Sequence, residues 1–290
     1  MPSSTFRYTS SDGAQITAYR WDPEGEPRAV IQVTHGMGEH AQRYDYVARA
    51  LNDAGFTVYA QDHRGHGASA DPDALGNLGQ GSWPALVDDI GLLSAHARAD
   101  HPGLPLILLG HSMGSFAVQQ YLLDHSADVD GVVLTGTAAI DVLEPALDLS
   151  QPLDLAMFNA PFQPARTDFD WLSRDEATVD AYVADPYCGF GIDPDSARLM
   201  FLGARRVADP AAVAAMPPDL PVYIAVGEAD PVNGGQALLT PLTGRYAAAG
   251  LTDVTVRVYP AARHEILNET NRDDVIDDLV SWIDRVVAGL

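Results

Sequence analysis

The sequence predicts an α/β protein whose mostly parallel central sheet is covered by helices on both faces. Short apolar runs rich in β-branched residues alternate along the chain with stretches whose apolar residues recur at helical spacing. Several of these runs contain no polar residue, which is typical of strands buried on both sides of a sheet. A chain of 290 residues with 47% apolar content can bury one large core, although its length also allows two domains.

The first half of the chain contains a hairpin and four further predicted strands. Residues 6–9 and 15–21 form the hairpin, because Asp12-Gly13 between them is a strong turn signal. Gly55 marks the end of the first predicted helix. The other strands predicted in this half are 29–34, 56–60, 105–109 and 131–136, and the helices are 43–54, 82–99 and 116–123.

The alternation stops after residue 136, and prolines break the next stretch into short apolar pieces. We expect residues 1–136 and 218–290 to form the core. Residues 137–217 are expected to form a mainly helical cap insertion over the carboxyl ends of the strands, where open parallel sheets bind their ligands. An independent helical domain and a linker are the alternatives, and the many apolar and aromatic residues argue against a linker.

Two strands and two helices complete the core after the predicted cap. The strands are predicted at 221–227 and 254–259, and a helix is predicted at 235–249. Val275, Leu279, Ile283 and Val286 mark the last helix by their spacing. The first turn of this helix is acidic, as the helix dipole favours.

A Gly-x-Ser-x-Gly motif at residues 110–114 lies between a predicted buried strand and a predicted helix. In this pattern the serine occupies a strained turn that exposes its hydroxyl, and the glycines leave room where a side chain would clash. The pentapeptide alone occurs by chance in many proteins, but its place between strand and helix is specific. The motif therefore predicts Ser112 as a catalytic nucleophile.

A serine nucleophile needs a base that takes its proton and an acid that orients the base. Asp230 comes directly after the predicted strand 221–227, and His264 comes after 254–259. The order Ser112, Asp230, His264 is the one that this sheet topology requires for a catalytic triad. We therefore predict Asp230 as the acid and His264 as the base.

Other assignments compete with two of these roles. Glu228 and Asp141 are alternative acids, but Asp-Pro after a strand forms a turn that can aim the carboxylate of Asp230. A surface position is the alternative for His264. Its eight fellow histidines all lie earlier in the chain, so none of them follows a strand downstream of the acid.

Acyl transfer also needs hydrogen-bond donors for the oxyanion of the intermediate. One is expected from the backbone N–H of Met113, directly after the nucleophile. The other is expected from Met37, in the loop that follows the first parallel strand. Both methionine side chains could be core packing, since the prediction concerns only their backbone N–H groups.

The charge balance excludes several classes of partner. The sequence has 40 acidic and 17 basic residues, all of the basic ones arginine, and its net charge is −23. Such a surface repels nucleic acids and anionic membranes, so we expect no nucleic-acid binding and at most transient contact with lipid surfaces. Solubility or a saline source would account for the acidic composition.

The single cysteine, Cys188, excludes an internal disulfide and a cysteine-rich metal site. The first residues lack an apolar signal region, and no stretch approaches the roughly 18 apolar residues of a membrane helix. We therefore expect a cytoplasmic protein, and the catalytic mechanism predicted above invokes no metal.

Three motifs carry a resemblance to a known family. They are His-Gly-Met-Gly-Glu-His at 35–40 with Arg43-Tyr44 after it, Asp-His-Arg-Gly-His-Gly at 62–67, and the serine motif. With them the chain resembles the monoacylglycerol lipase and lysophospholipase group of the α/β-hydrolases over nearly its whole length. Residues 166–186 are similar to the cap of bacterial members.

This resemblance implies the α/β-hydrolase fold and a serine hydrolase with the triad Ser112, Asp230 and His264. It also implies an oxyanion hole at Met37 and Met113, a lid that admits acyl chains, and no cofactor. We expect hydrolysis of carboxylic esters with medium or long acyl chains through an acyl-enzyme intermediate, with monoacylglycerol as the first choice of substrate.

Lysophospholipase activity is the runner-up, and acyl transfer to an alcohol other than water would use the same triad. A non-catalytic binding protein is disfavoured because no catalytic position is lost. Dehalogenase and epoxide hydrolase chemistry is excluded because those relatives have a carboxylate where this chain has Ser112.

Apolar residues of the predicted cap are expected to line a route for the acyl chain, since such clusters are seldom left in water. These residues are Leu153, Leu155, Met157, Phe158 and Phe162. Internal packing of the cap is the alternative for each of them.

Overall fold

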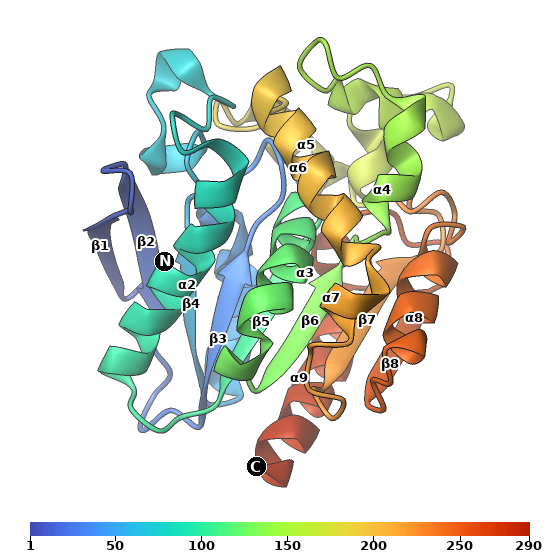
Figure 1. The fold of residues 1–290 in the computed structure, drawn as a ribbon. Coiled ribbons are helices and arrows are strands. Elements are labelled where there is room, and N and C mark those ends of the chain that lie inside the picture. The colour runs from blue at the N-terminus through green and yellow to red at the C-terminus, as the bar shows by residue number, and fades with distance from the viewer.

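The computed structural model describes residues 1–290 except for the side chain of Ala146. Eight strands form one sheet in the order β1-β2-β4-β3-β5-β6-β7-β8 (Figure 1). The strands are β1 (Ser4–Thr9), β2 (Gln15–Trp21), β3 (Ala29–Thr34), β4 (Phe56–Gln61), β5 (Leu106–His111), β6 (Gly131–Thr135), β7 (Val222–Gly227) and β8 (Val254–Tyr259).

The sheet is parallel from β4 to β8, and the β1–β2 hairpin joins it antiparallel at one edge. Every residue of β3, β4, β5, β6 and β7 is buried, as is typical of parallel strands that are covered on both faces of the sheet. Parallel strands end at the same edge, so the loops after β3, β5, β7 and β8 converge there. This convergence is what brings the predicted site residues together.

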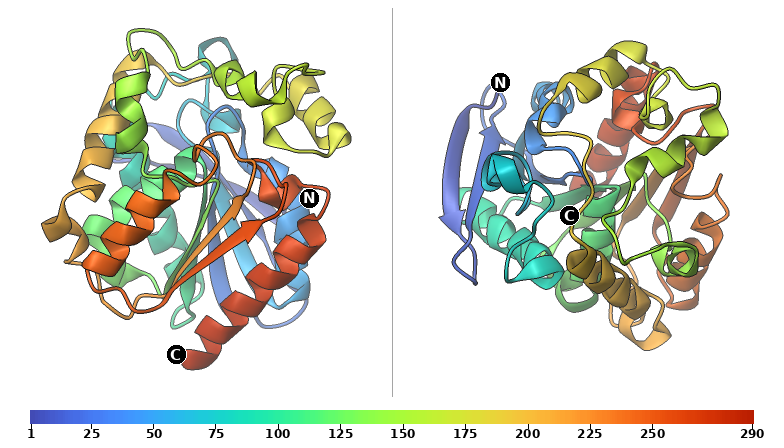
Figure 2. Two further views of the ribbon diagram at one scale, coloured as in Figure 1. Left: turned by 90° about the vertical axis from the view of Figure 1, so that its right-hand side faces the viewer. Right: turned by 90° about the horizontal axis from the view of Figure 1, so that it is seen from above.

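Helices cover both faces of the sheet (Figures 1 and 2). α2 (Ser82–Asp100), α3 (Met113–His125) and α8 (Leu239–Ala248) pack on one face, where they share a hydrophobic cluster with the strands. α1 (Asp45–Asp53) and α9 (Arg272–Gly289) pack on the other face in a second cluster. This arrangement confirms the predicted fold class.

The chain between β6 and β7, called here the β6–β7 segment (residues 136–221), lies above the carboxyl ends of the strands (Figures 1 and 2). Aspartates cap the starts of three of its helices: Asp175, Asp193 and Asp209 each accept a backbone N–H there. The helices are α4 (Ile140–Leu143), α5 (Glu176–Ala184), α6 (Pro194–Val207) and α7 (Pro210–Val213).

Short 3₁₀ helices occur in the loops and in the β6–β7 segment. They are Ala41–Tyr44, Gly67–Ser69, Pro72–Ala74, Ser126–Asp128, Glu144–Ala146, Leu155–Phe162, Asp170–Leu172 and Ile266–Asn268.

One helix starts later than its sequence predicts. The predicted range 235–249 contains α8, which begins only at Leu239. Gly234, Gly235 and Gln236 have φ angles of 64°, 59° and 77°, so the chain there is left-handed and cannot be part of an α-helix. The late start of α8 affects the site because these turns follow Asp230, and the Gly235 N–H donates to the Asp230 carbonyl at 3.2 Å.

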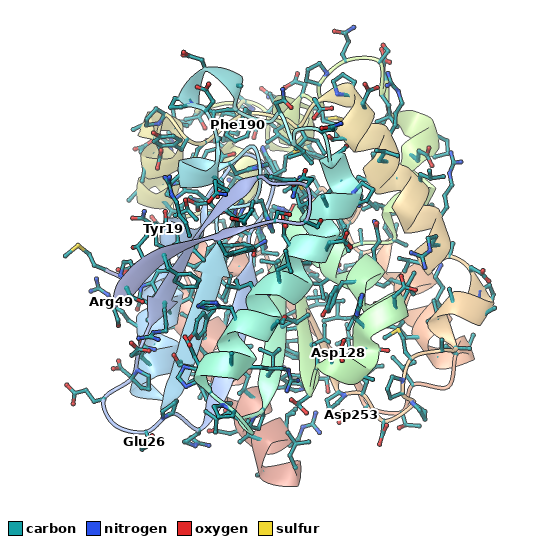
Figure 3. All side chains as sticks on the ribbon, turned by 60° about the vertical axis from the view of Figure 1, so that its left-hand side comes forward. Tyr19, Glu26, Arg49, Asp128, Phe190 and Asp253 are labelled. Carbon is teal, nitrogen blue, oxygen red and sulfur yellow. The ribbon has the colours of Figure 1, made fainter. Side chains whose placement is uncertain are left out.

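The surface carries the excess of acidic residues. Glu26 and Asp128 are exposed, and Figure 3 shows both with their side chains at the outside of the molecule. Many surface arginines pair with carboxylates, for example Arg285 with Asp253 at 2.7 Å. Among the helices in the described part of the chain, none is both long and apolar enough to cross a membrane.

Candidate active site

Ser112 occupies a strained turn between β5 and α3. Its φ and ψ angles are 50° and −122°, which a residue with a side chain rarely adopts. The two glycines of the motif make this turn possible: a Cβ at Gly110 would lie 2.7 Å from the Cα of Ser115, and a Cβ at Gly114 would collide with the carbonyl oxygen of Thr34. The motif thus places Ser112 in a turn outside the strand, on the wall of a cavity that is described below.

Asp230 and His264 come together at the ends of β7 and β8. The His264 Nδ1 lies 3.0 Å from the Asp230 Oδ1, and both side chains are almost completely buried. The Val232 N–H also donates to the Asp230 carboxylate, at 2.9 Å. This pairing leaves Nε2 as the free nitrogen of the imidazole.

The two competing acids lie elsewhere. Asp141 forms a two-pronged ion pair with Arg245, with both distances 2.7 Å. Glu228 is exposed and accepts the Ala261 N–H. The structure therefore brings Asp230, and neither competitor, to His264.

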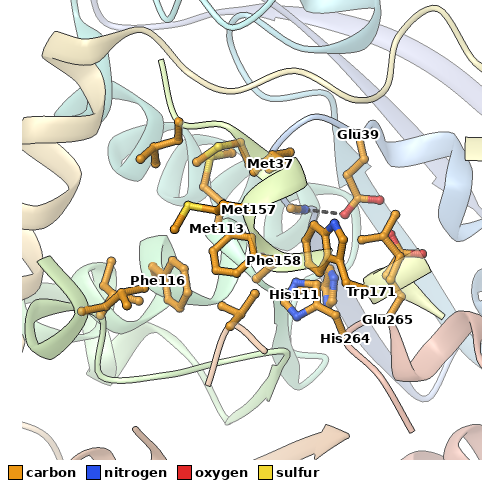
Figure 4. Close-up of a pocket in the computed structure, with 18 of the residues that line it drawn as sticks. Met37, Glu39, His111, Met113, Phe116, Met157, Phe158, Trp171, His264 and Glu265 are labelled. Carbon is orange, nitrogen blue, oxygen red and sulfur yellow. Dashed lines mark hydrogen bonds between the residues drawn. The ribbon is translucent and has the colours of Figure 1, made fainter. Parts of the chain in front are cut away.

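His264 lines the same cavity as Ser112 (Figure 4). Its Nε2 is buried and has no hydrogen-bond partner among the described residues. Burial alone would lower the pKa of His264, but the charge and the hydrogen bond of Asp230 outweigh burial and raise this pKa above its ordinary value of 6.5. The imidazole is thus a stronger base than a free histidine.

Met37 and Met113 line the same cavity as Ser112. Neither backbone N–H donates a hydrogen bond to an acceptor among the described residues. The preceding Gly36 N–H donates to the Glu39 Oε1 at 2.6 Å, which fixes the course of the loop that carries Met37.

A buried ion-pair network supports this loop. Arg43 donates to Glu39 at 2.6 Å and to both oxygens of Glu265 at 2.7 Å. Burial would raise the pKa of Glu39, but Arg43 and the hydrogen bonds to the carboxylate lower it below its ordinary 4.5. Because Glu265 follows His264 directly, the network connects the Met37 loop to the loop that carries the base.

The β6–β7 segment is tied to both loops. The Tyr182 hydroxyl and the Gly189 N–H donate to the Gly38 carbonyl at 2.8 and 3.0 Å. The Glu265 N–H donates to the Leu172 carbonyl at 2.8 Å. The segment is therefore part of the site and not only a cover.

The cavity has a mainly apolar wall (Figure 4). Of the residues expected to line an acyl route, Leu153, Leu155, Met157 and Phe158 do line it. The placement of Phe162 differs from the expectation: it is not a lining residue, and its ring lies under the guanidinium of Arg263 at 4.4 Å.

Sequence reasoning missed several residues of this cavity. The missed apolar residues come from α3, α4, α6 and the adjoining turns, where an apolar residue facing a cavity has the same spacing as one facing the core. They are Phe116, Ile140, Leu143, Leu147, Met200, Phe201, Trp171 and Leu172. Glu39 and Arg43 stand in a motif noted above, so their pairing had a local signal, whereas their link to Glu265 had none.

Three neutral histidines lie under the Met37 loop. His35, His63 and His66 are buried, with the His35 ring 4.2 Å from that of His63 and 5.3 Å from that of His66. Burial lowers the pKa of all three, that of His66 to about 4. These histidines are packing and hydrogen-bonding groups at neutral pH.

His40, Asp185 and Cys188 form the one group of three potential metal ligands among the described residues, with ligand atoms within 4.8 Å of one another. His40 Nε2 and Asp185 Oδ2 already form a hydrogen bond of 2.9 Å. Burial raises the pKa of the Cys188 thiol, which disfavours the thiolate that a metal needs. None of the three lines the cavity beside Ser112, so we assign them no part in the chemistry there.

Comparison with known proteins gives one consistent family. Residues 25–271 match the family model described as serine aminopeptidase, S33. A monoacylglycerol lipase of Mycolicibacterium smegmatis is 34% identical over 284 residues, covering 97% of this chain and 96% of that protein. A monoglyceride lipase of Homo sapiens is 29% identical and covers 96% and 90%.

Solved structures agree with this assignment. A thermostable carboxyl esterase from Bacillus coagulans, in complex with glycerol, has a TM-score of 0.86 and 27% identity over 99% of both chains. A monoglyceride lipase from Saccharomyces cerevisiae has a TM-score of 0.77 over 99% of this chain and 95% of its own, and at 20% identity it supports the fold alone. The chain therefore belongs to the S33 serine aminopeptidase family of α/β-hydrolases, as a carboxylic ester hydrolase of the monoacylglycerol lipase group.

Proposed function

We propose that this ester hydrolase cleaves monoacylglycerols of medium or long acyl chain length, with Ser112, His264 and Asp230 as its catalytic triad. The observation that carries the proposal is the common cavity: Ser112 on its strained turn and His264, paired through Nδ1 with Asp230, line the same mainly apolar space. The names of the bacterial and human relatives support the choice of substrate.

The geometry supports a two-step acyl transfer. His264 Nε2 takes the proton of the Ser112 hydroxyl as its oxygen attacks the ester carbonyl carbon, and Asp230 stabilises the imidazolium that forms. The carbonyl oxygen becomes an oxyanion that accepts from the N–H groups of Met37 and Met113, each donor contributing about 2.7–4 kcal/mol. His264 then gives its proton to the leaving alcohol oxygen, and water repeats the sequence on the acyl-enzyme.

The charge of the cavity favours a neutral head group. Besides His264, the ionisable residues on its wall are the carboxylates Glu39 and Glu265, the phenol of Tyr182, whose pKa burial raises, and the neutral imidazole of His111, whose pKa burial lowers to about 4. A phosphodiester would be repelled by these carboxylates, so we place lysophospholipase activity second. Acyl transfer to glycerol stays an alternative fate of the same acyl-enzyme.

We further propose residues 137–217 as the cap, with residues 1–136 and 218–290 as the core. The cap would close the cavity over the acyl chain and keep bulk water from the intermediate. Leu153, Leu155, Met157 and Phe158 are its contribution to the wall.

A substrate panel with one variant tests the proposal. Wild type and Ser112→Ala are compared on laurates of glycerol and of propanol and on lauroyl lysophosphatidylcholine, and both are exposed to a fluorophosphonate that labels activated serines. We expect monolaurin to be cleaved faster than the lysophospholipid, and Ser112→Ala to be inactive and unlabelled. Activity or labelling of Ser112→Ala would refute the nucleophile, and a faster reaction with the lysophospholipid would refute the substrate class.

A further inference from the structure

Trp171 carries a buried polar group that nothing in the described protein satisfies. Its side chain is 3% exposed, and its Nε1 has no hydrogen-bond partner among the described residues. The indoles of Trp21 and Trp83 do have partners, at 3.0 Å on Asp45 and 2.8 Å on Gln120. A buried N–H without an acceptor is unfavourable, so its retention at a functional site points to an acceptor that arrives with a ligand.

The position of Trp171 identifies that ligand as the substrate. The indole lines the cavity that contains Ser112, and its ring packs on the His264 ring at a centroid distance of 4.9 Å. Figure 4 shows Trp171 beside His264, on the side of the cavity where Glu39 and Glu265 lie and away from Phe116. The two adjacent rings that line the cavity here thus each carry a buried nitrogen without a partner among the described residues, Nε1 of Trp171 and Nε2 of His264.

The backbone of Trp171 is held to the loop that carries the base. The Trp171 N–H donates to the Asn159 Oδ1 at 2.9 Å, and the Asn159 side chain donates in turn to the Thr167 carbonyl at 2.6 Å. The Trp171 carbonyl accepts the His264 N–H at 3.4 Å. The indole thus keeps one position relative to the imidazole, as a substrate-binding group must.

We propose that the Trp171 indole N–H donates a hydrogen bond to a hydroxyl on the alcohol part of the ester, and so makes the enzyme selective for esters of polyhydroxylated alcohols. This inference rests on the proposed function. His264 must protonate the leaving alcohol oxygen, so the alcohol lies beside His264, and a hydroxyl on a neighbouring carbon lies next to the ring that packs on it.

The surroundings of the indole suit a hydroxyl better than any other acceptor. A hydroxyl that accepts from Trp171 keeps its own proton to donate, and the carboxylates of Glu39 and Glu265, which already accept from Arg43, lie on the same wall. A simple alkyl alcohol would leave the indole N–H unpaired. Selectivity based on such a buried donor exceeds what added apolar contact can give.

The test compares 1-lauroylglycerol with propyl laurate, which has the same acyl and carbon chains but lacks both free hydroxyls. Trp171→Phe keeps an aromatic ring and removes the N–H. We expect kcat/KM for 1-lauroylglycerol to fall about tenfold, and kcat/KM for propyl laurate to change less than about twofold. Wild type itself should prefer the glyceride by about tenfold, a measurement that does not depend on the folding of any variant.

Trp282→Phe is the matched control. Its Nε1 is also buried without a partner among the described residues, but the ring stacks on Tyr223 at 5.6 Å, away from the residues of the cavity. We expect this variant to keep the wild-type ratio of the two rates. Trp282 also shows that a buried N–H without a partner does not by itself indicate a substrate-binding group. The inference for Trp171 depends in addition on its position in the wall of the cavity.

Three results would overturn the inference: equal loss on both esters in Trp171→Phe, no loss on either, or equal rates of wild type on both esters. Equal loss would mean that Trp171 only packs against His264. Ser112→Ala in the same assays keeps the two proposals apart, since its activity would refute the catalytic serine whatever Trp171 does.

Discussion

The two ends of the cavity are held in place by different interactions. At one end, Glu39, Arg43 and Glu265 form a buried network of short ion pairs that joins the Met37 loop to the His264 loop. At the other end, the side chains of Phe116, Ile140 and Phe201 contribute apolar packing alone, where α6 contacts α3 and α4. Directional bonds define one geometry, whereas apolar packing tolerates several.

This difference suggests that the two ends of the cavity would contact different parts of a long-chain ester. Under the proposed function, the polar end would hold the reacting groups and the alcohol in one arrangement, and the apolar end would adapt to acyl chains of different length. Figure 4 shows Glu39 and Phe116 at opposite sides of the cavity. The predictions below change one end at a time.

The largest effect is expected from Arg43→Met, which removes the only cation between Glu39 and Glu265 among the described contacts of these carboxylates. Two buried carboxylates would lose their partner, so the free energy of unfolding should fall by about 3–5 kcal/mol. Urea denaturation at pH 7.5 measures it.

Arg285→Met is the control, because Arg285 makes a similar two-pronged pair with Asp253 but its side chain is 50% exposed. Its loss should be no more than about 1 kcal/mol. If Arg43→Met and Arg285→Met lowered the free energy of unfolding equally, the buried network would contribute no more to stability than a surface ion pair.

At the apolar end, Phe158→Asp should reduce activity according to acyl chain length. Phe158 lines the cavity, and displacing two methylene groups from contact at about 0.8 kcal/mol each should lower kcat/KM for laurate esters about 15-fold. Acetate esters of the same alcohol should change little, because their acyl group does not reach Phe158.

Phe162→Asp provides the comparison, since Phe162 lies under Arg263 and outside the cavity wall. The Phe162→Asp substitution should change kcat/KM for acetate esters and for laurate esters by the same factor. A chain-length effect in Phe162→Asp, or none in Phe158→Asp, would contradict the acyl route described here.

Most of the core was predictable, because its strands are short runs rich in β-branched residues that alternate with stretches of helical spacing. β3 and β8 have the predicted bounds 29–34 and 254–259. The start of α8 was not predictable from its apolar spacing, because the left-handed turns at 234–236 have no such signature apart from their glycines. The order of the short helices in the β6–β7 segment likewise depends on tertiary contacts that no local pattern records.

The candidate site divides in the same way. Ser112 and its neighbours form a local motif, and Asp230 and His264 follow strands, so the meeting of these residues could be predicted from chain order. Arg43 and Glu265 are 222 residues apart in the sequence, and only the fold brings them together. In the sequence, Trp171 has no feature that distinguishes it from an apolar core residue. Only the structure shows that its ring packs on that of His264.

A smaller effect concerns acid stability of the polar end. His66 stays neutral in the folded protein down to a pKa of about 4, whereas the unfolded chain takes up a proton near pH 6.5, so stability is lost as the pH falls below 6.5. Between pH 7.5 and 5.5 this one group should lower the free energy of unfolding by about 1.4 kcal/mol.

His66→Gln should remove this part of the decline, and His96→Gln, at a side chain 43% exposed, should keep the wild-type decline. Urea denaturation at the two pH values measures both. An identical decline in wild type and His66→Gln would show that His66 is not held neutral.

The smallest effect is on the rate near neutral pH. The base must be neutral, and the pKa of His264 is raised above 6.5, so kcat/KM should already be less than half of its plateau at pH 6.5. The measurement is a profile of kcat/KM on propyl laurate from pH 5 to 8, with circular dichroism to check folding. A flat profile, or a midpoint below 6.5, would contradict the pairing of His264 with Asp230 as the catalytic base.

Trapping the acyl-enzyme tests the central claim most directly. Wild type and Ser112→Ala are mixed with p-nitrophenyl laurate, quenched in acid within milliseconds and digested, and the peptides are weighed by mass spectrometry. We expect a single lauroyl group on the peptide that contains Ser112 in wild type and no acylated peptide in Ser112→Ala. A lauroyl group on another residue, or ester cleavage by Ser112→Ala at the wild-type rate, would contradict the account.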